Sequence, residues 1–220
     1  MQREIRVEIA TGTHLVGDLV VPQAARGVVL FAHGSGSSRH SSRNQYVASE
    51  LQKGGMATLL IDLLTAEEER EDMRGGHLRF DIGLLADRLF RASEWLAAEN
   101  ATRTLRIGLF GASTGGGAAL VAAARQPERI AAVVSRGGRP DLAGEALAQV
   151  LAPTLLLVGG RDTPVIDMNR DAYERLSAVR EMTIIPGASH LFEEPGTLEQ
   201  VSRLARTWFE RYLEVRDDNE

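Results

Sequence analysis

The most informative pattern of the sequence lies in the segment Leu105-Arg106-Ile107-Gly108-Leu109-Phe110-Gly111-Ala112-Ser113-Thr114-Gly115. An apolar run of strand type leads into G-x-S-x-G, and an alanine-rich helical stretch, residues 117–125, follows. A turn this sharp between strand and helix strains the backbone of the serine, and it needs small residues two positions on either side. The first N–H groups of the helix carry partial positive charge that can hold an oxyanion. The pattern therefore predicts a nucleophile elbow at Ser113.

Short apolar runs alternate with helical patterns on both sides of the elbow. Residues 79–99 show a clear helix, because Leu85, Leu89 and Leu96 fall on one apolar face. The alternation predicts an α/β fold, with a mostly parallel, doubly wound sheet and helices on both of its faces. Ligands bind such sheets beyond the carboxyl ends of the strands. The expected strands are 5–10, 15–21, 27–32, 56–64, 105–110, 130–135, 154–158 and 181–185, and the further expected helices are 44–53, 168–179 and 198–213.

The composition is that of a globular domain with small-molecule partners. A chain of 220 residues with 44% hydrophobic residues can bury one substantial core, and we expect a single domain over residues 1–220. The net charge is -5, and acidic and arginine residues are interspersed along the chain without a basic tract, so no nucleic-acid partner is expected. Charges close to Met1 and the lack of a run of about 18 apolar residues argue against a secretory leader and a membrane span. We expect a cytoplasmic protein, and the sequence leaves a homodimer open.

A serine hydroxyl needs a base, and an acid that orients the base, because alone it is a weak nucleophile at neutral pH. His190 lies in a loop directly after the last expected strand, and Asp162 directly follows the expected strand 154–158 with two glycines between. Both belong to the carboxyl edge of the sheet, where the Asp162 carboxylate can accept the Nδ1 proton of His190. The chain order Ser113, Asp162, His190 is that of α/β-hydrolases.

Each of these residues also has a simpler interpretation. G-x-S-x-G occurs by chance in many sequences, and His190 is also explained as a loop histidine bonded to a backbone carbonyl. Asp162 before Thr-Pro is a typical helix start, in which case Asp167 is the substitute acid. Asp167 itself has the pattern of an N-cap. The three groups together, in this order, favour catalysis.

Five segments carry a resemblance to a known family: the elbow, His33-Gly34-Ser35-Gly36-Ser37-Ser38, residues 135–141, residues 160–165 and residues 190–196. In these segments the chain resembles a cap-less α/β-hydrolase of the dienelactone-hydrolase-like group, over nearly its whole length. It is also similar to hydrolase domains that are joined to phosphoribosyltransferase domains in some bacterial proteins. Dienelactone hydrolases proper use a cysteine nucleophile, whereas this chain has Ser113 and no cysteine. The resemblance therefore does not identify dienelactones as the substrate.

The resemblance implies an oxyanion hole with two backbone donors. The segment after the third strand supplies one N–H, which maps to Ser35, and the residue after the nucleophile, Thr114, supplies the other. Removing one such donor typically costs about 2.7 to 4 kcal/mol of transition-state stabilisation. His33 opens the segment and is expected to shape it by hydrogen bonding.

Two arginines and a histidine are candidate substrate contacts. Arg136 and Arg139 follow an expected strand at the same edge of the sheet, and a guanidinium group matches a carboxylate or a phosphate. His40 is expected near the rim of the site. The alternative for Arg136 is structural, as a donor to carbonyl groups of its glycine-rich loop. The acidic run at residues 67–72 is expected to be a solvated loop without metal-ligand spacing.

The sequence therefore predicts a serine hydrolase that cleaves a small ester, lactone or thioester through an acyl-enzyme, without a metal or an organic cofactor. The pocket is expected to be shallow and open, since no long insertion precedes the strand 154–158 to form a large lid. Two other functions stay open. One is an acyltransferase of the same fold, in which an alcohol or amine replaces water. The other is a non-catalytic binding or scaffold module that keeps the elbow for folding reasons.

Overall fold

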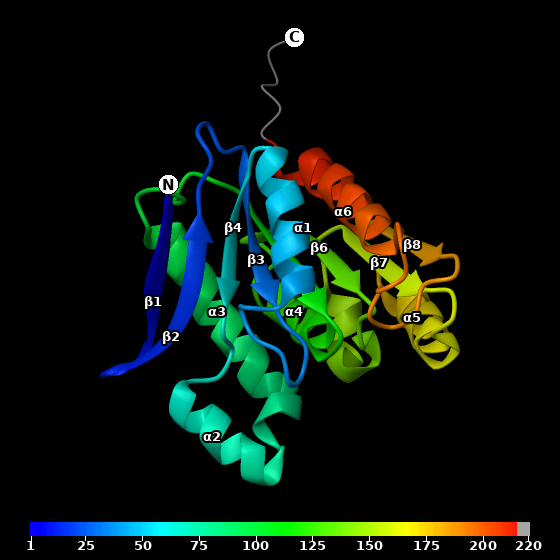
Figure 1. Cartoon of the computed structure of the whole chain (residues 1–220), viewed down its shortest axis with the longest axis horizontal. Helices are drawn as coiled ribbons and strands as arrows, with labels where there is room; N and C mark the ends of the chain where they lie inside the picture. Colours follow the sequence, from blue (N-terminus) through cyan, green and yellow to red (C-terminus); the bar gives the residue numbers. More distant parts are fainter. Residues whose placement is uncertain (215–220) are drawn as a thin grey trace.

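Eight strands form one sheet at the centre of the part of the chain that the computed structural model describes, residues 1–214 (Figure 1). Their order across the sheet is β1-β2-β4-β3-β5-β6-β7-β8. β1 and β4 pair with β2 in the antiparallel sense, and all other neighbours are parallel. The strands are β1 (Gln2–Ala10), β2 (Thr13–Val20), β3 (Gly27–Ala32), β4 (Met56–Ile61), β5 (Ile107–Ala112), β6 (Ile130–Arg136), β7 (Thr154–Gly159) and β8 (Arg180–Ile185).

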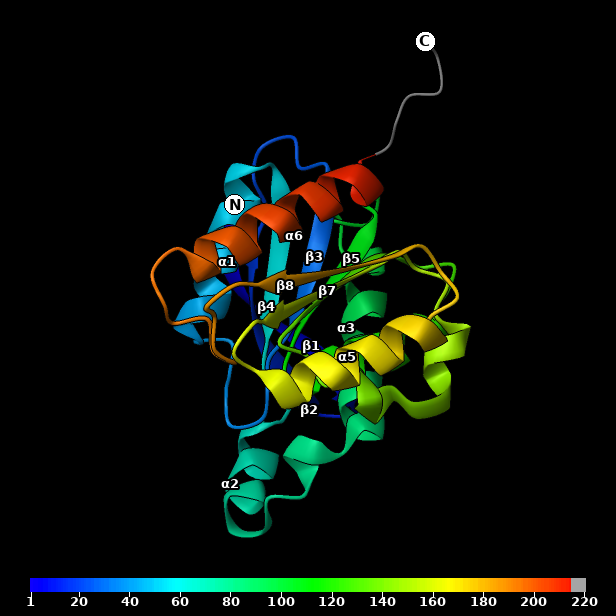
Figure 2. The same ribbon diagram turned by 90° about the vertical axis from the view of Figure 1, so that its right-hand side faces the viewer.

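Helices cover both faces of the sheet (Figure 2). α1 (Ser42–Lys53) and α6 (Thr197–Leu213) pack on one face, and α3 (Ile82–Ala98), α4 (Thr114–Arg125) and α5 (Thr163–Arg175) pack on the other. β3, β5 and β7 are buried at every position, as continuous apolar runs must be when both faces are covered. The predicted α/β-hydrolase fold is confirmed, and residues 1–214 hold no large cap domain.

The acidic run after β4 forms a helix, α2 (Ala66–Gly75), so the prediction of a solvated loop is wrong. The Thr65 hydroxyl accepts the N–H of Glu68, and the Glu68 carboxylate accepts the N–H of Thr65. This capping box satisfies two free donors of the first turn, where acidic side chains also favour the helix dipole. Gly76 ends the helix in a left-handed conformation with φ 67°. The short helix η1 (Leu78–Phe80) connects α2 to α3.

Two features of the segment after β6 differ from the predictions. α5 begins at Thr163, with Pro164 in its first turn, so the expected start at residue 168 is wrong. Asp167 consequently lies inside α5, exposed and paired with Arg170, and is not an N-cap. The 3-10 segment η2 (Pro140–Gln149) was not predicted, and it packs against α4.

β1 is one edge of the sheet, and its two faces differ in chemistry. Ile5 and Val7 point into the core, while Glu4, Arg6 and Glu8 alternate with them and are exposed. At the other edge, β8 is only partly covered. Within residues 1–214, no helix combines the length and the apolar character that crossing a membrane requires.

Candidate active site

Ser113 lies on the turn between β5 and α4, in a strained backbone conformation with φ 52° and ψ -125°. A positive φ is uncommon outside glycine and is typical of functional turns. The turn is tight because glycines surround it. A Cβ on Gly115 would lie 2.3 Å from the carbonyl oxygen of Ala32, and a Cβ on Gly111 would lie 2.5 Å from that of Gly115. The expected elbow geometry is therefore present, and side chains at these two glycines are excluded by backbone atoms.

Ser113, His190 and Asp162 lie in one hydrogen-bonded row. The Nδ1 atom of His190 is 2.6 Å from Oδ2 of Asp162, and its Nε2 atom is 3.3 Å from Oγ of Ser113. A carboxylate can only accept a hydrogen bond, so Nδ1 carries the proton and Nε2 is left as an acceptor facing the serine. Asp162 occupies the position before α5, yet its side chain makes no capping bond there. Its carboxylate is hydrogen-bonded to His190 instead.

The loop that carries His190 is fixed on both sides. The Glu194 carboxylate accepts hydrogen bonds from the backbone N–H and the hydroxyl of Ser189, and the backbone bond lowers the pKa of Glu194. Phe192 is buried with φ 56°, a strained value for a large side chain. Gly159 at the end of β7 approaches this loop so closely that a Cβ there would lie 2.5 Å from the Ser189 carbonyl oxygen.

His33 fixes the start of the loop after β3, as predicted. Its Nε2 atom accepts the backbone N–H of Leu63 at 3.1 Å, so the proton is on Nδ1, which donates to the carbonyl of Gly34 at 2.9 Å. Burial lowers the pKa of His33 and favours this neutral form. Farther along the loop, Arg39 is bound to Asp62 through its guanidinium and through its backbone N–H at 2.7 Å. The loop is thus tied to the residues after β4 at two points.

The two predicted oxyanion donors lie together, but one of them is engaged. The backbone N–H of Ser35 donates to the hydroxyl Oγ1 of Thr114 at 2.8 Å. Thr114 is the first residue of α4, so its own backbone N–H has no partner within the helix. Gly34 packs against the elbow, where a Cβ would lie 3.1 Å from Cβ of Ser113.

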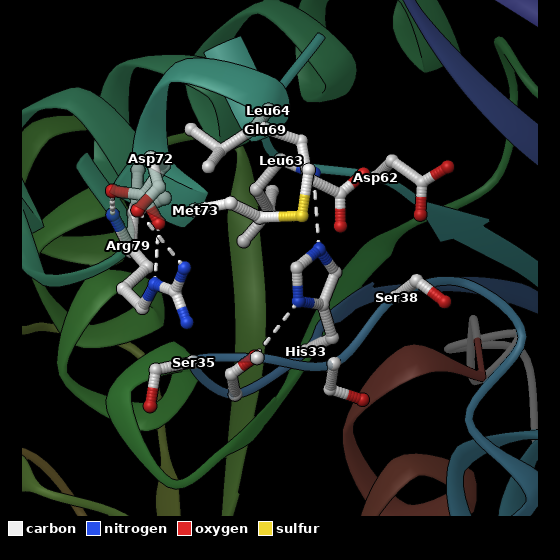
Figure 3. A pocket seen from close by; sticks show the side chains of 14 residues that line it. His33, Ser35, Ser38, Asp62, Leu63, Leu64, Glu69, Asp72, Met73 and Arg79 are labelled. Atoms are coloured by element: carbon white, nitrogen blue, oxygen red, sulfur yellow. Dashed lines mark hydrogen bonds and ion pairs between the residues drawn. The ribbon is translucent and has the colours of Figure 1, made fainter. Parts of the chain in front are cut away.

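A cavity of about 260 Å³ lies beside Ser35, on the side of the loop that faces α2 (Figure 3). Its lining includes Leu63, Leu85 and Met73 of α2. The sequence did not predict that α2, called the cover below, borders this cavity. The pattern T-x-x-E at Thr65 to Glu68 is the signal that could have found the helix.

Asp72 and Arg79 hold the cover in place. Asp72 is buried, and it accepts the backbone N–H groups of Leu78 and Arg79 and the Nε–H of Arg79. Burial raises the pKa of the Asp72 carboxyl, but the hydrogen bonds from Arg79 and Leu78 lower it by more, and the net pKa shift is downward. Figure 3 shows this pair at the α2 end of the cavity.

The three predicted substrate contacts have different environments. Arg136 is buried at the end of β6, over the ring of Phe192, and its Nε and Nη1 atoms have no hydrogen-bond partner among residues 1–214. Burial and the neighbouring Arg43 lower the pKa of Arg136 to about 10. Arg139 is bound through two nitrogens to Asp141, and His40 is exposed. The structural alternative for Arg136, bonds from these two atoms to loop carbonyls, is not observed.

Comparisons with known proteins show the family and the fold of the chain. A family model described as the dienelactone hydrolase family matches residues 16–215. The crystal structure of a dienelactone hydrolase from Anabaena variabilis has a TM-score of 0.95 and 61% identity, over 97% of this chain and 99% of that chain.

Two further relatives carry provisional names. A Mycobacterium tuberculosis protein named a phosphoribosyl transferase is 55% identical over 212 residues, which are 96% of this chain and 47% of that protein. The chain thus spans about half the length of this relative. A Bradyrhizobium protein named a 2-oxo-3-(5-oxofuran-2-ylidene)propanoate lactonase is 31% identical over 167 residues, 67% of this chain and 66% of that protein.

Proposed function

The chain belongs to the dienelactone hydrolase family, and we propose that it is a serine hydrolase that cleaves a small ester, lactone or thioester through an acyl-enzyme on Ser113. The observation that carries the proposal is the row of Ser113, His190 and Asp162 at 3.3 and 2.6 Å. A serine at a strained turn, a histidine with its free nitrogen toward it, and a carboxylate on the other nitrogen are the groups that acyl transfer needs.

In the proposed reaction, Oγ of Ser113 attacks the substrate carbonyl while Nε2 of His190 takes its proton. Asp162 keeps the ring oriented and stabilises the imidazolium that forms. The oxyanion develops at the start of α4, where Thr114 and Ser35 supply donors. His190 then gives its proton to the leaving alcohol, thiol or ring oxygen. Water, activated by His190, releases the acid and restores Ser113.

We propose small substrates because the cavity next to the oxyanion segment is small; Gly34 and Ser35 line this cavity, whereas Ser113, Asp162 and His190 do not. The cavity beside Ser35, about 260 Å³, lies just below the range of typical drug-sized pockets. Its apolar side chains include Leu63, Met73 and Leu85, which suit a short hydrocarbon group. A lactone fits the same chemistry, and one relative carries the provisional name of a lactonase.

Of the predicted substrate contacts, we favour Arg136. Its guanidinium is charged at neutral pH and lacks partners for two nitrogens, whereas that of Arg139 is already occupied by Asp141. A buried donor without a partner is costly, and a substrate oxygen would satisfy it. His40 is exposed and stays a proposed contact at the rim only.

The test is labelling with a fluorophosphonate probe, followed by intact mass, and turnover of p-nitrophenyl acetate. We expect one adduct in the wild type and none in Ser113→Ala, and a fall in kcat/KM of several orders of magnitude in Ser113→Ala and His190→Ala. Asp162→Asn should lower kcat by roughly 10⁴-fold, since the asparagine amide would donate to Nδ1 of His190 and place the imidazole proton on Nε2, the nitrogen that has to accept the serine proton.

Matched variants separate these roles from general damage. Ser177→Ala removes an exposed hydroxyl that donates to the carbonyl of Ala148, and Asp167→Asn removes the alternative acid, which is exposed on α5. Both should keep most of the turnover. An unlabelled, folded wild type would contradict the serine mechanism, and loss of activity in Asp167→Asn but not in Asp162→Asn would reassign the acid.

A further inference from the structure

The side chain of Thr114 has a hydrogen-bonding position that the proposed mechanism does not use. Its hydroxyl is buried and accepts the backbone N–H of Ser35 at 2.8 Å. A hydroxyl has one proton to donate as well. Among the residues that the structure describes, no acceptor for that proton is found. The hydroxyl therefore receives a hydrogen bond and has a donor to offer.

The residue that carries this donor belongs to the turn at which the negative charge of the proposed reaction would form. Thr114 directly follows Ser113 and begins α4, a helix of twelve residues, so its own backbone N–H has no partner within the helix. Gly34, the residue before Ser35, packs against Cβ of Ser113. The hydroxyl thus bridges the nucleophile's helix and the loop after β3, within one residue of the reacting oxygen.

The bridge is held by the loop, which has little freedom to turn away. His33 is bonded to Leu63, and Arg39 is bonded to Asp62 through both its backbone and its side chain. Ser35 lies between these two ties. Its N–H is consequently directed at Thr114, and reaching an oxyanion directly would require this bond to break first.

We propose that the hydroxyl of Thr114 is an oxyanion donor in its own right, and that the N–H of Ser35 acts through it. This inference rests on the proposed acyl-enzyme function. The chain Ser35 N–H to Thr114 O–H to oxyanion would be polarised along its length, because a hydroxyl that accepts from an N–H becomes a better donor. No covalent bond of Ser35 or Thr114 is formed or broken, and the proton stays on Thr114.

In the opposite role, the placeholder role, the Thr114 hydroxyl only occupies the Ser35 N–H in the absence of substrate. It must then move away before the substrate carbonyl can accept that N–H. The two roles predict opposite effects of removing the hydroxyl. If the hydroxyl is an oxyanion donor, its removal takes a hydrogen bond away from the transition state, so kcat would fall. A placeholder would no longer compete for the Ser35 N–H, so kcat would stay the same or rise.

The experiment compares Thr114→Val, which keeps the branched shape, with Thr114→Ser, which keeps the hydroxyl. For p-nitrophenyl acetate we expect kcat to fall roughly 10²-fold in Thr114→Val with little change in KM, and to stay within a few-fold of the wild type in Thr114→Ser. Phenylboronic acid, which forms a tetrahedral adduct on a serine, should bind more weakly to Thr114→Val in parallel. The matched control is Thr102→Val, whose buried hydroxyl donates to the carbonyl of Leu96 away from the elbow; its kcat should not change.

The outcomes are distinct from those of the proposed function. If fluorophosphonate labels Ser113 in every variant but Thr114→Val turns over as fast as the wild type, the donor role is overturned and the placeholder role takes its place. If the wild type itself is not labelled, the acyl-enzyme function fails first. Should Thr114→Val not fold, Thr114→Ala against Thr114→Ser gives the same comparison.

Discussion

The elbow and the α2 cover both lie beside the loop after β3 but are held together in different ways. At the elbow, backbone packs on backbone, and glycines at 111 and 115 leave no room for a Cβ. The cover is held by side chains: the capping box at Thr65 and the ion pair between Asp72 and Arg79. Packing of backbone atoms leaves no adjustable contact, whereas charged hydrogen bonds depend on protonation and can be exchanged.

The two regions should therefore tolerate substitutions to different degrees. The elbow positions the reacting atoms and is intolerant of added volume. The cover lines the cavity and can be altered while the sheet stays folded. The expected effects of substitutions therefore differ in kind, global at the elbow and local at α2.

The largest expected effect is that of Gly115→Ala. The new Cβ would lie 2.3 Å from the carbonyl oxygen of Ala32, and backbone atoms on both sides cannot move apart cheaply. We expect the free energy of unfolding to fall by about 3 kcal/mol, at the upper end of overpacking effects. Urea denaturation followed by circular dichroism measures it. Wild-type stability in this variant would show that the elbow can adjust.

Asp72→Asn should act on the cover alone. The amide would place an N–H group against the Nε–H of Arg79, so the pair would lose its main bond. We expect amide hydrogen exchange to become faster in residues 66–80, with a smaller loss of global stability than in Gly115→Ala. Labelling of Ser113 should persist. A fall in global stability as large as at Gly115 would mean that the cover is part of the cooperative core.

Gly76→Ala provides the contrast to Gly115 within one residue type. Gly76 has φ 67° but no atom within 4 Å of an added Cβ, so only the cost of the left-handed conformation applies. That cost is about 1 kcal/mol. In the same urea measurement, the loss in the free energy of unfolding should be much larger for Gly115→Ala than for Gly76→Ala. Equal losses would show that conformation rather than packing sets the effect at the elbow.

The smallest expected effect is the pH dependence of stability. The two regions should lose stability in different pH ranges. His33 has a lowered pKa in the fold, so its contribution to stability is complete above its ordinary value of 6.5 and is lost as the pH falls through the folded pKa. Asp72 also has a lowered pKa, so its contribution is complete above 3.8 and is lost only at lower pH. Acid should therefore loosen the loop after β3 before α2.

Urea midpoints between pH 7 and 4 in the wild type and in His33→Gln test this order, because glutamine does not titrate. In His33→Gln, the urea midpoint should lack the first part of its decline, which begins as the pH falls below 6.5. A decline of the same size in both proteins would assign it to other groups.

The sequence predicted the parts of the fold that depend on neighbours along the chain. G-x-S-x-G between an apolar strand and a helix indicated the elbow, and the loops after late strands indicated Asp162 and His190. It did not predict contacts between segments far apart, such as Arg39 with Asp62 or the hydrogen bond from Ser35 to Thr114. The acidic run was misinterpreted because composition favours a solvated loop, while the capping box and the glycine stop favour a helix.

The alternating charges on the outer face of β1 bear on how the protein behaves when it is concentrated. An edge strand presents unpaired backbone groups that invite another sheet to add on. Glu4, Arg6 and Glu8 would have to be stripped of water for a second strand to dock there. These charges disfavour sheet-to-sheet aggregation at this edge. Molecules in concentrated solution should therefore not associate through β1.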